Sequence, residues 1–161
     1  MSATNAVKSN IDKPDLVTVA GVRLEFKHYP GERAQTPTLV FLHEGLGCLA
    51  LWRDFPQKLA ALTGLPAFVY SRQGYGRSDA CALPRPLRYM HNEALEVLPQ
   101  VLNAAGISDY VLVGHSDGGS IALIHAGGLS PDGLHGVITM APHVFCEELS
   151  VRSIAEAREA F

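Results

Sequence analysis

Apolar residues in this chain gather in four short continuous runs, separated by longer segments with helical spacing. The runs are TLVFLH at 38–43, AFVYS at 67–71, DYVLVG at 109–114 and LHGVITMAP at 134–142. The segments in which apolar positions recur every three or four residues are 52–64, 88–106 and 118–128. Short buried strands that alternate with helices are typical of α/β proteins. The pattern therefore predicts an α/β fold, a parallel sheet with helices on both faces.

The stretches before the first run have a different pattern. VTVAG at 17–21 and VRLEFKHY at 22–29 alternate apolar and polar residues around Gly21. Alternation with a period of two indicates strands with one buried face, and a glycine between two such strands favours a hairpin turn. We expect a short antiparallel hairpin here. Residues 1–15 are polar and contain Pro14, so they are expected to be a flexible lead-in.

Composition and charge indicate one ordinary globular domain. Of the 161 residues, 47% are hydrophobic and 18% are charged, and the formal net charge is −3. Proteins that bind nucleic acid or membrane surfaces usually carry a basic stripe, which this sequence lacks. The N-terminus has no apolar run of signal-peptide length, and no run reaches the ~18 apolar residues that span a membrane. We predict a cytoplasmic protein with no nucleic-acid or membrane partner.

The three cysteines, Cys48, Cys81 and Cys146, do not indicate a disulfide framework or a zinc site. Their number is odd and their spacings are unrelated. We expect them to be small, mostly buried apolar residues. Nothing in the sequence indicates a metal site or a required cofactor.

One short motif carries chemistry. Residues 114–118 read GHSDG, a match to G-x-S-x-G, and they lie between a predicted strand and a predicted helix. In that context the glycines permit a sharp turn that exposes the Ser116 hydroxyl beside a helix N-terminus, which favours negative charge. The motif therefore predicts Ser116 as a nucleophile. A glycine-rich turn that merely contains a serine is the alternative.

At this point the sequence resembles the α/β-hydrolase fold family, whose nucleophile elbow is this strand, turn and helix. HEGLG at 43–47 follows the first parallel strand, where the family carries its oxyanion loop. The resemblance implies that the backbone N–H groups of Gly45 and Asp117 are the oxyanion donors. Glu44 stands where the family usually has a glycine.

The resemblance extends from about residue 16 and corresponds to the N-terminal half of a typical family member. It implies a core over 16–144 and the start of a cap helix over 145–161. In that helix Ser150 is the expected N-cap, and Val151, Ile154 and Phe161 are expected to share one stripe. SRQGYGRSD at 71–79 is similar to a loop of cap-bearing members. Within it we expect Arg77 and Asp79 to be structural.

The family orders its triad as serine, acid, histidine along the chain, so the base must follow Ser116. His125 lies nine residues along the helix from Ser116, about 13 Å away along the axis, and cannot reach its hydroxyl. His135 begins the last strand, at the opposite edge of the sheet, and is expected on the surface. His143 follows that strand at the edge where α/β active sites form. It is retained as a candidate base, although the family's histidine comes from a much later loop.

The remaining candidates are expected to have structural roles. His43 heads the 43–47 loop and is expected to hold it by hydrogen bonds. The side chain of His115 is expected to point away from Ser116. Glu147 and Glu148 stand where some members place an acid, but are more simply interpreted as the start of the cap helix.

A dinucleotide-binding domain is a remote alternative. GLGCLA at 45–50 fits the looser fingerprint G-x-G-x-x-G/A after a strand. The acid expected about twenty residues later is missing, because the next strand ends in Ser71 and Arg72. This alternative also leaves the GHSDG motif unexplained.

The predicted function is that of a serine hydrolase that forms an acyl-enzyme from an ester-like or other small carbonyl substrate. The catalytic acid and histidine are expected outside this chain. The chain would then be the N-terminal piece of a larger hydrolase, or a second polypeptide or copy would complete the sheet and the triad. The competing prediction is a non-catalytic fragment or pseudo-enzyme that binds a partner chain or ligand in the same cleft.

Overall fold

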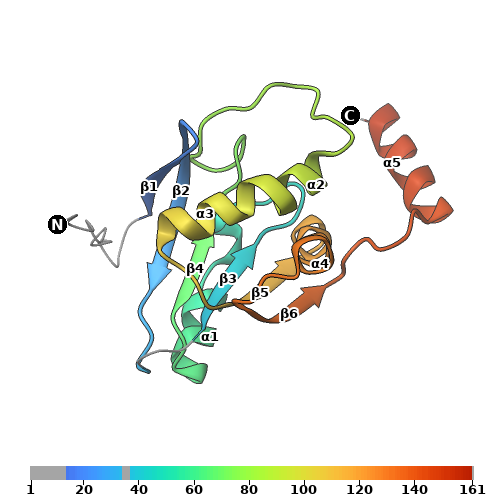
Figure 1. The fold of residues 1–161 in the computed structure, drawn as a ribbon. Coiled ribbons are helices and arrows are strands. Elements are labelled where there is room, and N and C mark those ends of the chain that lie inside the picture. The colour runs from blue at the N-terminus through green and yellow to red at the C-terminus, as the bar shows by residue number, and fades with distance from the viewer. Residues whose placement is uncertain (1–13, 34–36, 161) are drawn as a thin grey trace.

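A computed structural model describes residues 14–33 and 37–160, and its centre is one six-stranded sheet (Figure 1). The strand order is β1-β2-β4-β3-β5-β6. The strands are β1 (Asp15–Val19), β2 (Val22–Tyr29), β3 (Thr38–Leu42), β4 (Ala67–Tyr70), β5 (Tyr110–His115) and β6 (Leu134–Met140). Four of them, β4, β3, β5 and β6, are parallel, as the apolar runs predict. Their carboxyl ends therefore meet at one edge of the sheet.

The predicted hairpin is confirmed at β1 and β2, which pair antiparallel. Ala20 and Gly21 form its two-residue turn, with φ values of 50° and 83°. Positive φ at both central positions matches the twist of the flanking strands. Strand β2 then pairs antiparallel with β4, so the hairpin extends the parallel sheet.

Helices cover both faces of the sheet, also as predicted. On one face, α3 (Leu98–Ala105) and α4 (Asp117–Leu129) pack with the buried side chains of Val40, Phe68 and Leu112. On the other face, the 3₁₀ helix η1 (Leu49–Trp52) and α1 (Phe55–Thr63) pack with Phe41, Val69 and Val113. This burial on both faces explains why the parallel strands are continuous apolar runs rather than alternating ones.

Two predicted helices differ in detail from the structure. In the segment 52–64, Trp52 ends η1 and the α-helix begins only at Phe55. Pro56 lies in its first turn, where the missing N–H costs nothing. The segment 88–106 is divided into α2 (Tyr89–Asn92), a π-helical stretch η2 (Glu93–Val97) and α3. In a regular α-helix the ring of Pro99 would collide with the carbonyl of residue 95. The wider η2 stretch, with Leu98 N–H bonded to the Glu93 carbonyl, precedes that proline.

The C-terminal helix α5 (Glu148–Ala160) lies to one side of the sheet (Figure 1). It begins before Ser150, so the expectation that Ser150 is its N-cap is wrong. The N–H of Val151 bonds to the carbonyl of Glu147, which already makes Ser150 part of the first turn. The expected stripe is exposed, with Val151 at 51% and Ile154 at 70%. Phe161, its third expected member, lies outside the described residues.

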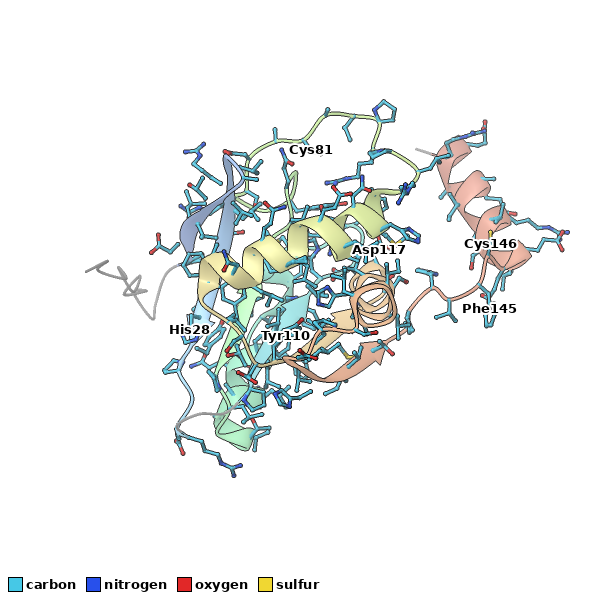
Figure 2. The ribbon with its side chains drawn as sticks, in the orientation of Figure 1. His28, Cys81, Tyr110, Asp117, Phe145 and Cys146 are labelled. Carbon is cyan, nitrogen blue, oxygen red and sulfur yellow. The ribbon has the colours of Figure 1, made fainter. Side chains whose placement is uncertain are left out.

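Two further expectations concern the cysteines and the N-terminus. Cys48 and Cys81 are only half-buried and Cys146 is exposed, so the prediction of mostly buried cysteines is wrong. Figure 2 shows Phe145 and Cys146 on the segment that leads from the sheet to α5. Most of the expected lead-in, residues 1–13, lies outside the described residues. In the part that the structure describes, no helix combines the length and apolar character needed to cross a membrane.

Candidate active site

The predicted nucleophile Ser116 is the single residue between β5 and α4, and its backbone conformation is unusual. Its φ is 51° and its ψ is −116°. A positive φ is unfavourable for a residue with a Cβ and persists only where the surroundings impose it. Here the Ser116 N–H donates to the carbonyl of Met140 at 2.8 Å, and its own carbonyl accepts from the N–H of Ser120 at 3.0 Å. The turn is therefore held on both sides by backbone hydrogen bonds.

Gly118 shows how closely this turn approaches the neighbouring strand. A Cβ at Gly118 would fall 1.9 Å from the carbonyl oxygen of Leu42, the last residue of β3. No side chain fits at that distance. The first turn of α4 therefore packs directly against the chain that enters the 43–47 loop.

The structure brings His143 to Ser116. Nε2 of His143 lies 3.1 Å from Oγ of Ser116. The Ser120 hydroxyl holds the backbone of His143 in place, because it accepts from the His143 N–H and donates to the His143 carbonyl, both at 2.9 Å. Sequence reasoning missed Ser120. The available signal was a small polar residue next to an apolar stretch of the predicted helix, four positions after the nucleophile.

The other ring nitrogen of His143 has no acidic partner in residues 14–33 and 37–160. His143 is exposed, and no hydrogen bond joins its Nδ1 to a carboxylate there. The nearby Glu148 instead pairs with Arg152 at 2.5 Å within α5. The described residues thus supply a serine and histidine in contact, without the third group that orients the base in a triad.

His43 holds the 43–47 loop by hydrogen bonds, as predicted. Its Nδ1–H donates to the carbonyl of Glu44 at 2.7 Å, and its Nε2 accepts from the N–H of Arg72 at 3.1 Å. These partners fix the neutral tautomer. Burial, together with the charge of Arg72, lowers the pKa of His43 to about 3. Both nitrogens are occupied, so His43 is not available as a base.

Arg72 is the second support of this loop, and sequence reasoning assigned it no role there. Its guanidinium donates to the carbonyls of His43 at 2.6 Å and Glu44 at 3.0 Å. The side chain is only 1% exposed. A charged residue directly after a buried strand run was the available signal, since such a group needs buried acceptors.

The side chains of Glu44, in the 43–47 loop, and His115, at the end of β5, lie close together. The carboxylate of Glu44 folds over Gly47 and lies 3.5 Å from Nδ1 of His115. The ring of His115 also contacts Trp52. His115 is thus engaged away from the Ser116 hydroxyl, as predicted.

The two predicted oxyanion donors lie on segments in direct contact. No hydrogen bond within the described residues uses the backbone N–H of Gly45 or Asp117, and the first N–H groups of a helix have no partner inside it. A Cβ on Gly45 would lie 2.8 Å from the Asp117 carboxylate. That carboxylate accepts a hydrogen bond from the hydroxyl of Tyr89. Figure 2 shows Asp117 at the start of α4, near α2.

Comparison with known proteins identifies the family. The sequence pattern of the family described as alpha/beta hydrolase fold matches residues 37–157, which is well over half of the chain. This chain belongs to the alpha/beta hydrolase fold family. A search of curated proteins found no match.

Solved structures agree with this hydrolase fold. A CIB-like hydrolase from Thermoplasma acidophilum matches with 21% identity and a TM-score of 0.70, over 81% of this chain and 62% of that one. A proline iminopeptidase from Mycobacterium smegmatis matches with 24% identity and a TM-score of 0.66, over 78% of this chain and 42% of that one. A thermophilic esterase from Thermogutta terrifontis matches with 18% identity and a TM-score of 0.68, over 88% of this chain and 50% of that one. The chain therefore spans between 42% and 62% of the length of these three proteins.

The dinucleotide-binding alternative does not fit this structure. In a dinucleotide fold the glycine-rich loop opens directly into a helix whose N-terminus binds pyrophosphate. Here the 45–50 segment leads into η1, a 3₁₀ helix of four residues, and α1 begins only at Phe55.

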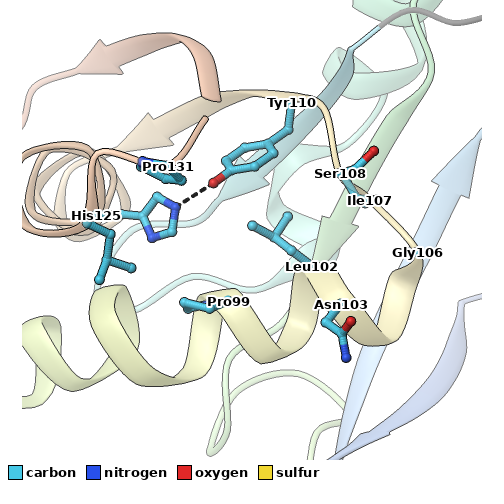
Figure 3. A pocket seen from close by; sticks show the side chains of 10 residues that line it. Pro99, Leu102, Asn103, Gly106, Ile107, Ser108, Tyr110, His125 and Pro131 are labelled. Atoms are coloured by element: carbon cyan, nitrogen blue, oxygen red, sulfur yellow. Dashed lines mark hydrogen bonds between the residues drawn. The ribbon is translucent and has the colours of Figure 1, made fainter. Parts of the chain in front are cut away.

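His125 and His135, the other candidates after Ser116, have hydrogen-bond partners of their own. His125 is buried, donates to the Ala94 carbonyl at 2.8 Å and accepts from the Tyr110 hydroxyl at 2.7 Å. This pair borders a cavity of about 470 Å³ (Figure 3). Because Tyr110 begins β5 and Ser116 follows its end, the cavity lies at the opposite edge of the sheet. His135 is exposed and pairs with Asp109 at 3.0 Å, as its predicted surface location implies.

The loop at 71–79 is structural, as expected. Asp79 forms an ion pair with Arg23 of β2 at 2.7 Å. The backbone N–H of Arg77 donates at 3.1 Å to the buried carboxylate of Glu25, which also accepts from the hydroxyl of Ser71 at 2.8 Å. These contacts attach the loop to the hairpin.

Proposed function

We propose that this hydrolase uses Ser116 as the nucleophile of an acyl-transfer reaction on an ester-like or other small carbonyl substrate. The observation that carries the proposal is the strained Ser116 with its hydroxyl 3.1 Å from Nε2 of His143. A serine becomes nucleophilic when a base in hydrogen-bond contact takes its proton. Ser116 in its turn would supply the nucleophile, and His143 would supply the base, for formation of an acyl-enzyme.

In the proposed reaction, His143 acts as the base. As Oγ of Ser116 bonds to the substrate carbonyl carbon, its proton passes to Nε2 of His143. The N–H groups of Gly45 and Asp117 stabilise the negative oxygen that forms. The leaving group departs with the proton from His143, and water then attacks the acyl-enzyme by the same route.

The acid that orients the base is proposed to come from outside the described residues. In triad enzymes a carboxylate holds the second ring nitrogen of the histidine. A longer chain or a second polypeptide could supply that carboxylate, and could also supply a histidine that replaces His143. Mutation of His143 distinguishes these two arrangements.

The test is covalent labelling of the chain with a fluorophosphonate, followed by intact mass. The Ser116 oxygen bonds to phosphorus, fluoride leaves, and the base takes the proton. We expect labelling of the wild type and none of Ser116→Ala. Ser130→Ala is the matched control, because Ser130 is also a non-glycine residue with positive φ, at the other end of α4. Wild type that stays unlabelled, both alone and with a C-terminal half added, would refute the proposal.

His143→Gln tests the base in the same assay. A general base typically contributes about 10²–10⁴-fold, so labelling should slow by at least about 10²-fold. An unchanged rate would assign the base to another group. Since the fold neighbours include an esterase and a proline iminopeptidase, small esters and N-terminal prolyl amides are the first substrates to try.

A non-catalytic binding function is the second candidate. It is favoured by the absence, among residues 14–33 and 37–160, of a carboxylate on Nδ1 of His143. Under this hypothesis Ser116 stays unreactive even when a C-terminal half is added. Restored ester hydrolysis in that complementation experiment would exclude it.

A further inference from the structure

We propose that Tyr89 and the carboxylate of Asp117 form a positioning pair that sets the spacing of the two oxyanion donors. This inference rests on the proposed function and concerns two side chains, those of Tyr89 and Asp117, that the proposed triad and oxyanion hole do not use. The two side chains act on the positions of the backbone N–H groups of Gly45 and Asp117, and not by contact with the substrate.

The first step is the contact between the donor segments. Asp117 supplies one donor N–H, and its side chain turns back against the Cα of Gly45, which supplies the other. The place where a Cβ of Gly45 would lie is 2.8 Å from Oδ2 and 3.3 Å from Oδ1 of Asp117. The carboxylate therefore occupies the space of the missing side chain and acts as a spacer between the 43–47 loop and the first turn of α4.

The second step is the restraint on that spacer. The hydroxyl of Tyr89, the first residue of α2, donates a hydrogen bond to Oδ2 of Asp117. The ring of Tyr89 is held in turn by the guanidinium of Arg85, 5.5 Å from the ring centroid. Arg85 donates to the carbonyl of Gln73 at 2.5 Å. Tyr89 thus connects the donor segments to the 71–88 region.

The third step is charge. Asp117 directly follows Ser116, whose Oγ attacks the substrate in the proposed reaction. A negative charge on the Asp117 carboxylate near the developing oxyanion opposes formation of that oxyanion. The Tyr89 hydroxyl holds the carboxylate on Gly45. Without that hydrogen bond the carboxylate is free to turn, the donor spacing is no longer fixed, and its charge is less well compensated. Both effects raise the energy of the transition state more than that of the bound substrate.

The test compares second-order rates of fluorophosphonate labelling at Ser116 in the 161-residue chain. Tyr89→Phe keeps the ring under Arg85 and removes only the hydrogen bond, and we expect labelling to slow about 10-fold or more. Asp117→Ala should slow it at least as much. Asp117→Asn should retain most of the rate, because its amide oxygen accepts the same hydrogen bond without the charge. Tyr29→Phe, in β2 on the other side of the sheet, is the control and should label like the wild type.

Kinetics separate positioning from general stability. With an ester that the wild type hydrolyses, Tyr89→Phe should lower kcat about 10-fold while KM stays within about twofold. Equal labelling of Tyr89→Phe and wild type would overturn the positioning pair while leaving the proposed function intact. Equal loss in Asp117→Asn and Asp117→Ala, or a loss that follows a lowered Tm, would overturn it too. If wild-type Ser116 is labelled neither alone nor with a C-terminal half added, the proposed function fails and this inference with it.

Discussion

Nε2 of His143 lies 3.1 Å from Oγ of Ser116, although the residues are 27 positions apart and belong to different connections of the sheet. The contact depends on a third residue. Ser120, one turn along α4 from Ser116, bonds to both the N–H and the carbonyl of His143. The same helix therefore presents the serine and anchors the segment that carries the histidine.

The first prediction concerns this anchor. Ser120→Ala removes the two hydrogen bonds to His143 and leaves the His143 backbone without this restraint, so we expect fluorophosphonate labelling of Ser116 to slow. The free energy of unfolding should fall by about 1–2 kcal/mol. Labelling rates and urea unfolding of Ser120→Ala and wild type measure both effects. Ser150→Ala, in the exposed helix α5, is the control and should change neither quantity.

The second prediction concerns the close approach of α4 to β3. Gly118→Ala places a Cβ 1.9 Å from the Leu42 carbonyl oxygen, so it should destabilise the fold by about 3 kcal/mol or more. Gly127→Ala is the matched control in the same helix, where a Cβ would meet nothing within 4 Å. It should stabilise the protein by up to about 1 kcal/mol. Similar unfolding midpoints for the two variants would contradict the packing described.

The third prediction separates stability from reactivity at Gly45. Gly45→Ala brings a Cβ to 2.8 Å from the Asp117 carboxylate, the end of a side chain that can move. The free energy of unfolding should therefore change by only about 1 kcal/mol. Labelling of Ser116 should slow about 10-fold, because the spacing of the donor segments changes. A variant that labels at the wild-type rate would show that this spacing is unimportant.

The fourth prediction follows from the lowered pKa of His43. The unfolded histidine titrates near its ordinary value of 6.5, and the folded one at about 3. Between these values the unfolded state binds more protons, so stability is lost as the pH falls from 6.5 toward 3. The slope from this group reaches about 1.4 kcal/mol per pH unit. Unfolding curves of wild type and His43→Asn across this range should differ by that slope, and parallel curves would contradict it.

The fifth prediction concerns the pair at the opposite edge of the sheet. Tyr110→Phe leaves Nε2 of the buried His125 without its donor, which should cost about 1–3 kcal/mol of stability. The rate of Ser116 labelling should not change, because the pair lies at the other end of β5. Thermal unfolding and labelling of one preparation test both statements. A large loss of reactivity in folded Tyr110→Phe would argue against a purely structural role.

The sequence predicted the architecture well because local patterns determine it. Continuous apolar runs identified the four parallel strands, and alternation around Gly21 identified the hairpin. The strand, turn and helix around Ser116 were predictable for the same reason, since glycine-rich turns and helix starts depend on adjacent residues. Helix details were less predictable. The π-helical stretch accommodates a single residue, Pro99, and a single residue leaves no repeating pattern in the sequence.

The support of the candidate site could not be predicted in this way. Arg72 meets the His43 carbonyl across 29 positions, and Tyr89 meets Asp117 across 28. Periodicity indicates which face of an element is buried. It does not indicate which polar side chains meet across two elements. His143 was placed at the correct edge of the sheet, but its contact with Ser116 depends on Ser120, whose role only the packing of α4 makes evident.

The hydrogen bond from the Ser116 N–H to the Met140 carbonyl continues the pairing of β5 with β6 by one step. Ser116, the proposed nucleophile, is thus the last residue that bonds to β6, the edge strand of the sheet that residues 14–33 and 37–160 form. A displacement of β6 is therefore expected to shift the backbone of Ser116 as well, because this hydrogen bond joins the two.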